Sequence, residues 1–251
     1  MFYRFKEKKL NYNIIFPKID KGIVLIYLSG FPTLPKENLF TKYCQEKGIT
    51  IIMPHYYGSW LSDGNFTPNN LIKTANDVIK IAKKGKAIEQ YNFVEKKWKI
   101  NSIILGGGSF GGLIALLSAQ TNNINKIFLS APLIDLKNQG IFYREENLIH
   151  SLEFARRIYK NVYRGIEQKF WNDFFTNKLS KTSINYNKLN EKNILIIHGE
   201  KDNTINIKHS VKFASKLKNV KLIKLKNADH RIWDTINKNK LSQVTNWMLK
   251  K

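Results

Sequence analysis

Short apolar runs alternate with amphipathic stretches along most of this chain. Residues 22–28 (Gly-Ile-Val-Leu-Ile-Tyr-Leu) and 49–53 (Ile-Thr-Ile-Ile-Met) are almost continuously apolar and rich in β-branched residues. This pattern is typical of strands that are covered on both faces. Residues 35–47 and about 67–84 have helical spacing instead, the second behind a Thr-Pro start. Strands that alternate with amphipathic helices predict a parallel sheet with right-handed crossovers.

The same alternation continues in the second half of the chain. Further strands are expected at residues 100–105, 124–130, 193–197 and 220–225. Residues 2–19 alternate apolar and charged positions in places, as the strands of an antiparallel hairpin do. We therefore expect a single α/β domain over residues 1–251, built on a mostly parallel, twisted sheet of about eight strands with helices on both faces.

The regular alternation stops between about residues 136 and 190. Within this stretch, residues 147–164 have helical spacing with an apolar stripe, and four aromatic residues follow between positions 170 and 175. We expect a helical insertion here. Its aromatic side chains either pack as core or line an apolar pocket, and the two roles are compatible.

A Gly-x-Ser-x-Gly sequence follows the strand predicted at 100–105. It reads Gly107-Gly108-Ser109-Phe110-Gly111, and a helix-forming stretch begins directly after it. At such a strand–turn–helix junction the serine is held in a strained backbone conformation that exposes its hydroxyl at the top of the sheet. Glycines on both sides remove the Cβ atoms that would block so tight a bend. Ser109 is therefore a candidate nucleophile.

Two further candidate catalytic residues follow Ser109 in the sequence. A serine hydroxyl needs a base near neutral pH, and that base needs an acid to orient it. Asp202 lies in the turn after the strand predicted at 193–197, and His230 lies on a loop after the strand at 220–225. The order Ser, Asp, His, each beyond a predicted strand, is the order that accompanies this serine turn. The sequence predicts a triad of these three residues.

With these motifs the chain resembles the α/β-hydrolase superfamily, in particular the serine peptidases and esterases related to prolyl oligopeptidases and serine aminopeptidases. The resemblance implies an α/β-hydrolase fold with a small helical cap insertion at about 136–190. The chain departs from the family pattern at Ser29, where a histidine is common. The matching stretches are residues 107–111, 198–202 and 228–230, and more loosely 28–32 and 57–64.

The reaction expected of these residues is acyl transfer. Ser109 attacks the carbonyl carbon of an ester or amide, while His230 takes its proton and Asp202 orients the imidazole. The backbone N–H groups of Phe31 and Phe110 are expected to bind the negative oxygen that develops. This chemistry needs no metal or organic cofactor, and the expected partners are small esters, amides or short peptides.

The sequence leaves several alternatives open. Asp135, at the end of the preceding strand, is a rival acid, and Asp202 could instead cap a helix that starts near Ile205. His198 is expected to stabilise the turn beneath Asp202. The same nucleophile could also serve a thioesterase or acyltransferase, and the fold could serve a non-catalytic binding protein.

The chain carries a net charge of +23, from 42 Lys and Arg against 19 Asp and Glu. Such a surplus can attract nucleic acid, anionic membranes or acidic substrates. However, the lysines are spread along the whole chain, and short basic clusters such as residues 83–86 and 96–99 come without a nucleic-acid-binding motif. We interpret the charge as solvated surface and expect no specific nucleic-acid partner.

Composition points to a globular protein. Of the 251 residues, 43% are hydrophobic and 12% aromatic, which is enough for one substantial core. No apolar run approaches the roughly 20 residues of a membrane helix, so no membrane insertion is expected. The single cysteine, Cys44, fits a reducing, cytoplasmic location and is expected to be a buried thiol in a helix.

Overall fold

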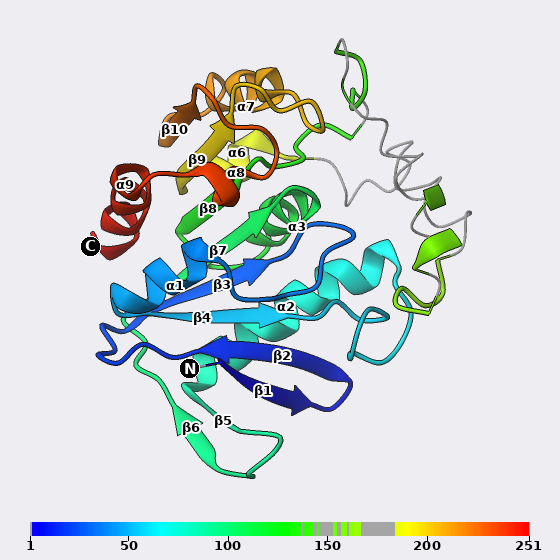
Figure 1. Cartoon of the computed structure of the whole chain (residues 1–251), viewed down its shortest axis with the longest axis vertical. Helices are drawn as coiled ribbons and strands as arrows, with labels where there is room; N and C mark the ends of the chain where they lie inside the picture. The colour runs from blue at the N-terminus through cyan, green and yellow to red at the C-terminus, as the bar shows by residue number, and fades with distance from the viewer. Residues whose placement is uncertain are drawn as a thin grey trace.

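The computed structural model describes residues 2–136, 138–142, 145, 153–154, 157–159, 161–166 and 184–250. Eight strands form its central sheet: β1 (Phe2–Glu7), β2 (Leu10–Ile15), β3 (Ile23–Leu28), β4 (Ile49–Pro54), β7 (Ser102–Gly108), β8 (Lys126–Ser130), β9 (Asn193–Gly199) and β10 (Val220–Leu225). Their order is β1-β2-β4-β3-β7-β8-β9-β10 (Figure 1). Strand β2 is antiparallel to both of its neighbours, and every other adjacent pair is parallel. The predicted sheet is confirmed.

Helices cover both faces of this sheet (Figure 1). In the described part of the chain they are α1 (Leu39–Glu46), α2 (Pro68–Lys84), α3 (Phe110–Ala119), α6 (Tyr186–Leu189), α7 (Ile207–Ala214), α8 (Ile232–Thr235) and α9 (Lys238–Leu249). Apolar side chains of α2, α3, α6 and α7 share one core cluster, and those of α1, α8 and α9 share another. Because successive strand residues face opposite sides, Ile26 belongs to the first cluster and Leu25 to the second.

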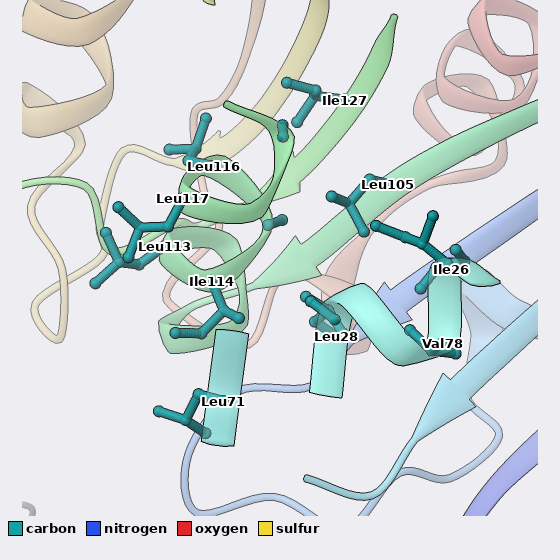
Figure 2. Packing of buried hydrophobic residues seen from close by; sticks show 14 of the residues in the cluster. Ile26, Leu28, Leu71, Val78, Leu105, Leu113, Ile114, Leu116, Leu117 and Ile127 are labelled. Atoms are coloured by element: carbon teal, nitrogen blue, oxygen red, sulfur yellow. The ribbon is translucent and has the colours of Figure 1, made fainter. Parts of the chain in front are cut away.

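Helix α3 lies deep in the first cluster. All ten of its residues are buried, as expected of a helix that is apolar on every side. Figure 2 shows Leu113, Ile114, Leu116 and Leu117 of α3 beside side chains of α2 and of strands β3, β7 and β8. Each such leucine or isoleucine stabilises the fold by roughly 1.5–3 kcal/mol. The first turn of α3, and with it Ser109, is therefore fixed by the core.

The chain reverses its course across the sheet between β3 and β7. From β3 it passes through α1 to β4 on one side, and α2 then carries it back to β7 on the other side of β3. Loops leave the carboxyl ends of β3 and β7 in opposite directions, which is where open α/β sheets form a binding crevice. A Cβ atom added to Gly30, after β3, would lie 3.1 Å from the Cβ of Ser109, after β7. The fold thus brings the loop after β3 against Ser109.

Helix boundaries follow their capping residues. Helix α1 begins at Leu39, later than the start predicted at residue 35, because Asn38 and Thr41 form a reciprocal cap. The Asn38 side chain accepts from the Thr41 N–H at 2.9 Å, and the Thr41 hydroxyl accepts from the Asn38 N–H at 2.8 Å. Helix α2 is capped by Thr67 as predicted. Cys44 is fully buried in α1, also as predicted.

A second, two-stranded sheet that was not predicted lies between α2 and β7, and its strands are β5 (Lys86–Ile88) and β6 (Glu95–Lys97). Most of the helical cap predicted at about 136–190, including the aromatic residues at 170–175, lies outside the described residues. One described part of it, residues 161–166, contacts the body of the protein. There the ring of Tyr163 packs against those of Phe31 and Phe66, with centroids 4.7 and 4.8 Å apart.

Candidate active site

Ser109 occupies the sharp turn between β7 and α3. Its φ of 51° and ψ of −124° lie in a region that residues with side chains rarely adopt. A Cβ atom on Gly107 would lie 2.2 Å from the carbonyl oxygen of Gly111, and one on Gly111 would lie 2.1 Å from that of Leu28. No side chain fits at either position. Both glycines of the motif are therefore required by the turn that strains Ser109.

The backbone of Ser109 is held on both sides of the turn. Its N–H donates to the carbonyl oxygen of Ser130 at 2.9 Å, and its carbonyl oxygen accepts from the N–H of Leu133 at 2.9 Å. The side chain makes no capping hydrogen bond to α3, whose residues are all described. The hydroxyl is consequently not used to complete the helix, and Ser109 lines an open pocket.

Asp202 and His230 come together from loops that follow adjacent strands. The loops after β9 and β10 leave the same edge of the sheet, and the N–H of Lys201 donates to the carbonyl oxygen of Ala228 at 3.0 Å. A Cβ atom on Gly199 would lie 2.3 Å from that same oxygen, so only glycine permits so close an approach. In this arrangement Nδ1 of His230 lies 2.8 Å from Oδ2 of Asp202.

The Asp202 carboxylate is surrounded by donors. Its Oδ1 accepts from the backbone N–H groups of Thr204 and Ile205, at 2.9 and 2.8 Å. Its Oδ2 faces His230 and Nε2 of His198, the latter at 3.1 Å. Burial by itself would raise the pKa of Asp202, but the hydrogen bonds, first those of the two histidines, outweigh it and lower the pKa to about 2. Asp202 is ionised at neutral pH and stabilises a proton on Nδ1 of His230.

His198 lies at the end of β9, beneath Asp202. Its Nε2 is also 2.9 Å from the carbonyl oxygen of Ile205. Because a carbonyl oxygen only accepts, Nε2 carries a hydrogen. Its Nδ1 lies 2.8 Å from the hydroxyl of Ser210 on α7, so the ring is held at both nitrogens. His198 supports the Asp202 turn, as the sequence predicts. The contact of Ser210 with His198 depends on how α7 packs, so it could not be predicted from the local sequence.

The geometry separates Asp202 from its alternatives. The helix expected shortly after Asp202 is α7, and its cap is Asn206, so Asp202 does not cap it. The carboxylate of Asp135 accepts from the backbone and side-chain nitrogens of Asn138, at 3.3 and 2.6 Å. The carboxylate that contacts His230 is that of Asp202.

The sequence of this chain matches a model of the prolyl oligopeptidase family over residues 38–251. The chain belongs to this family. The matched range contains Ser109, Asp202 and His230 but not the loop that carries Phe31. A search of curated proteins finds no match for the chain.

Solved structures show the α/β-hydrolase fold for this member of the prolyl oligopeptidase family. Est1E from Butyrivibrio proteoclasticus is 20% identical, with 99% of this chain and 95% of that chain covered and a TM-score of 0.63. A monoacylglycerol lipase from Paleococcus ferrophilus is 13% identical, with 96% and 98% covered and a TM-score of 0.65. Alpha/beta hydrolase domain-containing protein 10 from mouse is 17% identical, with 99% and 96% covered and a TM-score of 0.60. At these identities the likeness concerns the fold.

Two pockets of this prolyl oligopeptidase family member adjoin both Ser109 and His230. The first, of about 530 Å³, is also lined by Phe31 and Phe110. The second, of about 420 Å³, extends towards Tyr27. A group bonded to a carbonyl carbon at Ser109 therefore has room on either side. In the described part of the chain, no cluster of three or more His, Cys, Asp or Glu residues could hold a metal ion.

The predicted oxyanion donors lie on the wall of the first pocket. Phe110 is the first residue of α3, where N–H groups point out of the helix. The N–H of Phe31 makes no backbone hydrogen bond among the described residues. The ring of Phe31 packs between Phe66 and Tyr163, which fixes the loop after β3.

Among the described helices, none combines the length and the apolar character needed to cross a membrane.

Proposed function

We propose that this protein is a serine hydrolase that cleaves carboxylic esters through an acyl-enzyme intermediate, with Ser109, His230 and Asp202 as its triad. The observation that carries this proposal is the contact of His230 Nδ1 with the ionised, buried Asp202 at 2.8 Å. This contact leaves Nε2 of His230 as the base beside the pocket that His230 shares with the strained Ser109.

In the proposed reaction the Ser109 hydroxyl attacks the ester carbonyl carbon as its proton passes to Nε2 of His230. The carbonyl oxygen becomes negative and accepts hydrogen bonds from the N–H groups of Phe31 and Phe110. Each such donor lowers the barrier by about 2.7–4 kcal/mol. His230 then returns the proton to the departing alcohol. Water, activated by the same imidazole, releases the acid and restores Ser109.

The charge around the first pocket favours esters over substrates with a free amino terminus. Its described lining carries Lys201 and Arg231 against the single acidic residue Asp229. Binding of a free α-ammonium group calls for an unopposed carboxylate, whereas a neutral or anionic ester is compatible with this lining. Membership of the prolyl oligopeptidase family favours a second candidate activity, cleavage of a blocked peptide amide by the same residues.

The proposal is tested by replacing Ser109 with alanine. The Ser109→Ala protein should fail to hydrolyse short p-nitrophenyl esters and should not be labelled by a fluorophosphonate. Ser215→Ala, which alters an exposed serine at the carboxyl-terminal cap of α7, should retain both. Labelling that persists without Ser109 would rule out the assigned nucleophile. Comparison of p-nitrophenyl esters with blocked and free aminoacyl anilides separates the esterase from the peptidase.

A further inference from the structure

The hairpin β5–β6 carries an exposed apolar tip away from the candidate active site. It forms its own two-stranded sheet and projects at the bottom of Figure 1. Four large apolar residues on it, Ile88, Tyr91, Phe93 and Val94, are exposed by 60, 66, 80 and 48%. Water-exposed apolar side chains gathered on one protrusion usually mark an interaction surface. We call residues 88–94 the hairpin tip.

The conformation of the hairpin tip is held by hydrogen bonds. The buried Glu89 carboxylate accepts from the N–H groups of Tyr91 and Asn92, at 3.0 and 2.7 Å. The N–H of Glu89 donates to the carbonyl oxygen of Val94 at 2.9 Å, and that of Phe93 donates to the carbonyl oxygen of Glu89 at 3.1 Å. The tip therefore presents its apolar side chains in one arrangement rather than as a loose loop.

Phe93 is an unusual residue for its position. Its φ of 55° lies where glycine or asparagine is favoured and an aromatic side chain is strained. Its ring is 80% exposed, so the ring adds almost nothing to the core in return for that strain. Strained residues of this kind point to a role outside folding.

Lysines lie on the strands and at the base of the hairpin that carries the tip. Between residues 83 and 99 there are six lysines and two glutamates, a local net charge of +4. The Glu89 carboxylate accepts hydrogen bonds from the backbone of the tip, and the Glu95 carboxylate lies 3.2 Å from both Lys86 and Lys97. The net charge of the hairpin is therefore positive. An aromatic and aliphatic tip within a positive rim matches the surface of an anionic lipid bilayer.

We propose that the hairpin tip docks the protein on anionic membranes, with Phe93, Tyr91 and Val94 among the lipid headgroups and the lysines against the lipid phosphates. Aromatic residues favour this interfacial depth, and adsorption of this kind requires no membrane-spanning helix. Single-stranded nucleic acid also binds aromatic and basic residues, but it stacks along grooves. The tip is convex and half aliphatic, which favours lipid.

The proposed docking does not depend on the proposed hydrolase activity. The hairpin leads into the amino end of β7, since β6 ends at Lys97 and β7 begins at Ser102. Ser109, Asp202 and His230 all follow carboxyl ends of strands. A protein docked through the hairpin would keep its pockets open to solution, so the inference concerns location rather than a lipid substrate.

The charge requirement is tested by sedimentation with vesicles of phosphatidylcholine alone or mixed with phosphatidylglycerol. The protein should bind the mixed vesicles and release them in high salt. The pair Lys97→Gln and Lys99→Gln should weaken binding about 25-fold, at about fivefold per lysine. The matched pair Lys224→Gln and Lys226→Gln, exposed at the other edge of the sheet, should retain it. Equal loss in both pairs, or no binding to mixed vesicles, overturns the proposal.

The apolar requirement is tested at Phe93. Phe93→Ser should weaken vesicle binding about tenfold without changing ester hydrolysis, whereas Val211→Ser, at an exposed apolar position of α7, should not weaken it. In Phe93→Cys, an attached environment-sensitive fluorophore should shift to the blue on mixed vesicles, since Cys44 is buried and does not compete for label. An unshifted probe refutes the docking geometry. Loss of oligonucleotide binding alone in Phe93→Ser would replace lipid with nucleic acid as the partner.

Discussion

Replacement of Asp202 by asparagine tests the centre of the candidate site. At present every group around the carboxylate is a donor: two backbone N–H groups and two histidine nitrogens. An asparagine that turns its nitrogen towards His230 would donate to Nδ1 and leave the hydrogen on Nε2. The imidazole could then no longer accept the Ser109 proton. The same exchange in a serine-protease triad lowers kcat by about 10⁴, and we expect a loss of that order.

The same substitution changes how stability depends on pH. The pKa of Asp202 is lowered from 3.8 to about 2 in the folded protein, so the carboxylate stabilises the fold by about 2 kcal/mol at neutral pH. Because the folded pKa is the lower one, this stabilisation is present above the unfolded pKa and is lost as the pH falls. About 1 kcal/mol should be lost between about pH 5 and about pH 3. Asp202→Asn should lack this component.

Two measurements check these expectations. Initial rates on a p-nitrophenyl ester give the loss of kcat, with Asp135→Asn as the matched carboxylate control that should remain active. Urea unfolding of Asp202→Asn and of the unaltered protein, across the same acidic range, gives the difference in slope. An active Asp202→Asn beside an inactive Asp135→Asn would show that the acid is wrongly assigned. Identical pH slopes would contradict the lowered pKa.

Three further predictions concern the turn at Ser109 and two buried side chains. Gly111→Ala should destabilise the fold by more than about 3 kcal/mol, because its Cβ would lie 2.1 Å from the Leu28 carbonyl oxygen. Gly64→Ala, with open space around its Cβ, should destabilise it by only about 1 kcal/mol. Urea unfolding measures both changes. Cys44 should react with a thiol reagent only on unfolding, since burial raises its pKa well above the usual range; reaction in the native state would contradict this. Burial lowers the pKa of His55 to about 4, so the stability it confers is lost as the pH falls from about 6.5 towards 4, and His55→Gln should flatten that part of the stability curve.

The fold was predictable because its signals are local. Residues 22–28 and 49–53 are apolar on both faces, so they could only be buried strands, and Thr67 caps α2 at the predicted place. The start of α1 was missed because a reciprocal cap of Asn38 and Thr41 outweighs the proline at position 35. The short β5–β6 sheet was missed because it depends on contacts that are distant in sequence, such as the Gln90 N–H with the Arg4 carbonyl oxygen.

The same distinction between local signals and distant contacts applies to the candidate site. Backbone requirements can be recognised in the sequence because they call for glycine. Only glycine fits at positions 107 and 111 of the Ser109 turn, and only glycine at position 199 allows the loops of Asp202 and His230 to approach so closely. These glycines indicate which loops approach one another. The contacts that tune them are made by side chains from other elements and leave no local mark. The second histidine on Asp202, which helps to lower its pKa, is held from α7. A sequence can therefore indicate a candidate triad by its glycines, while the hydrogen bonds that lower the pKa of the Asp202 carboxyl follow only from the packed structure.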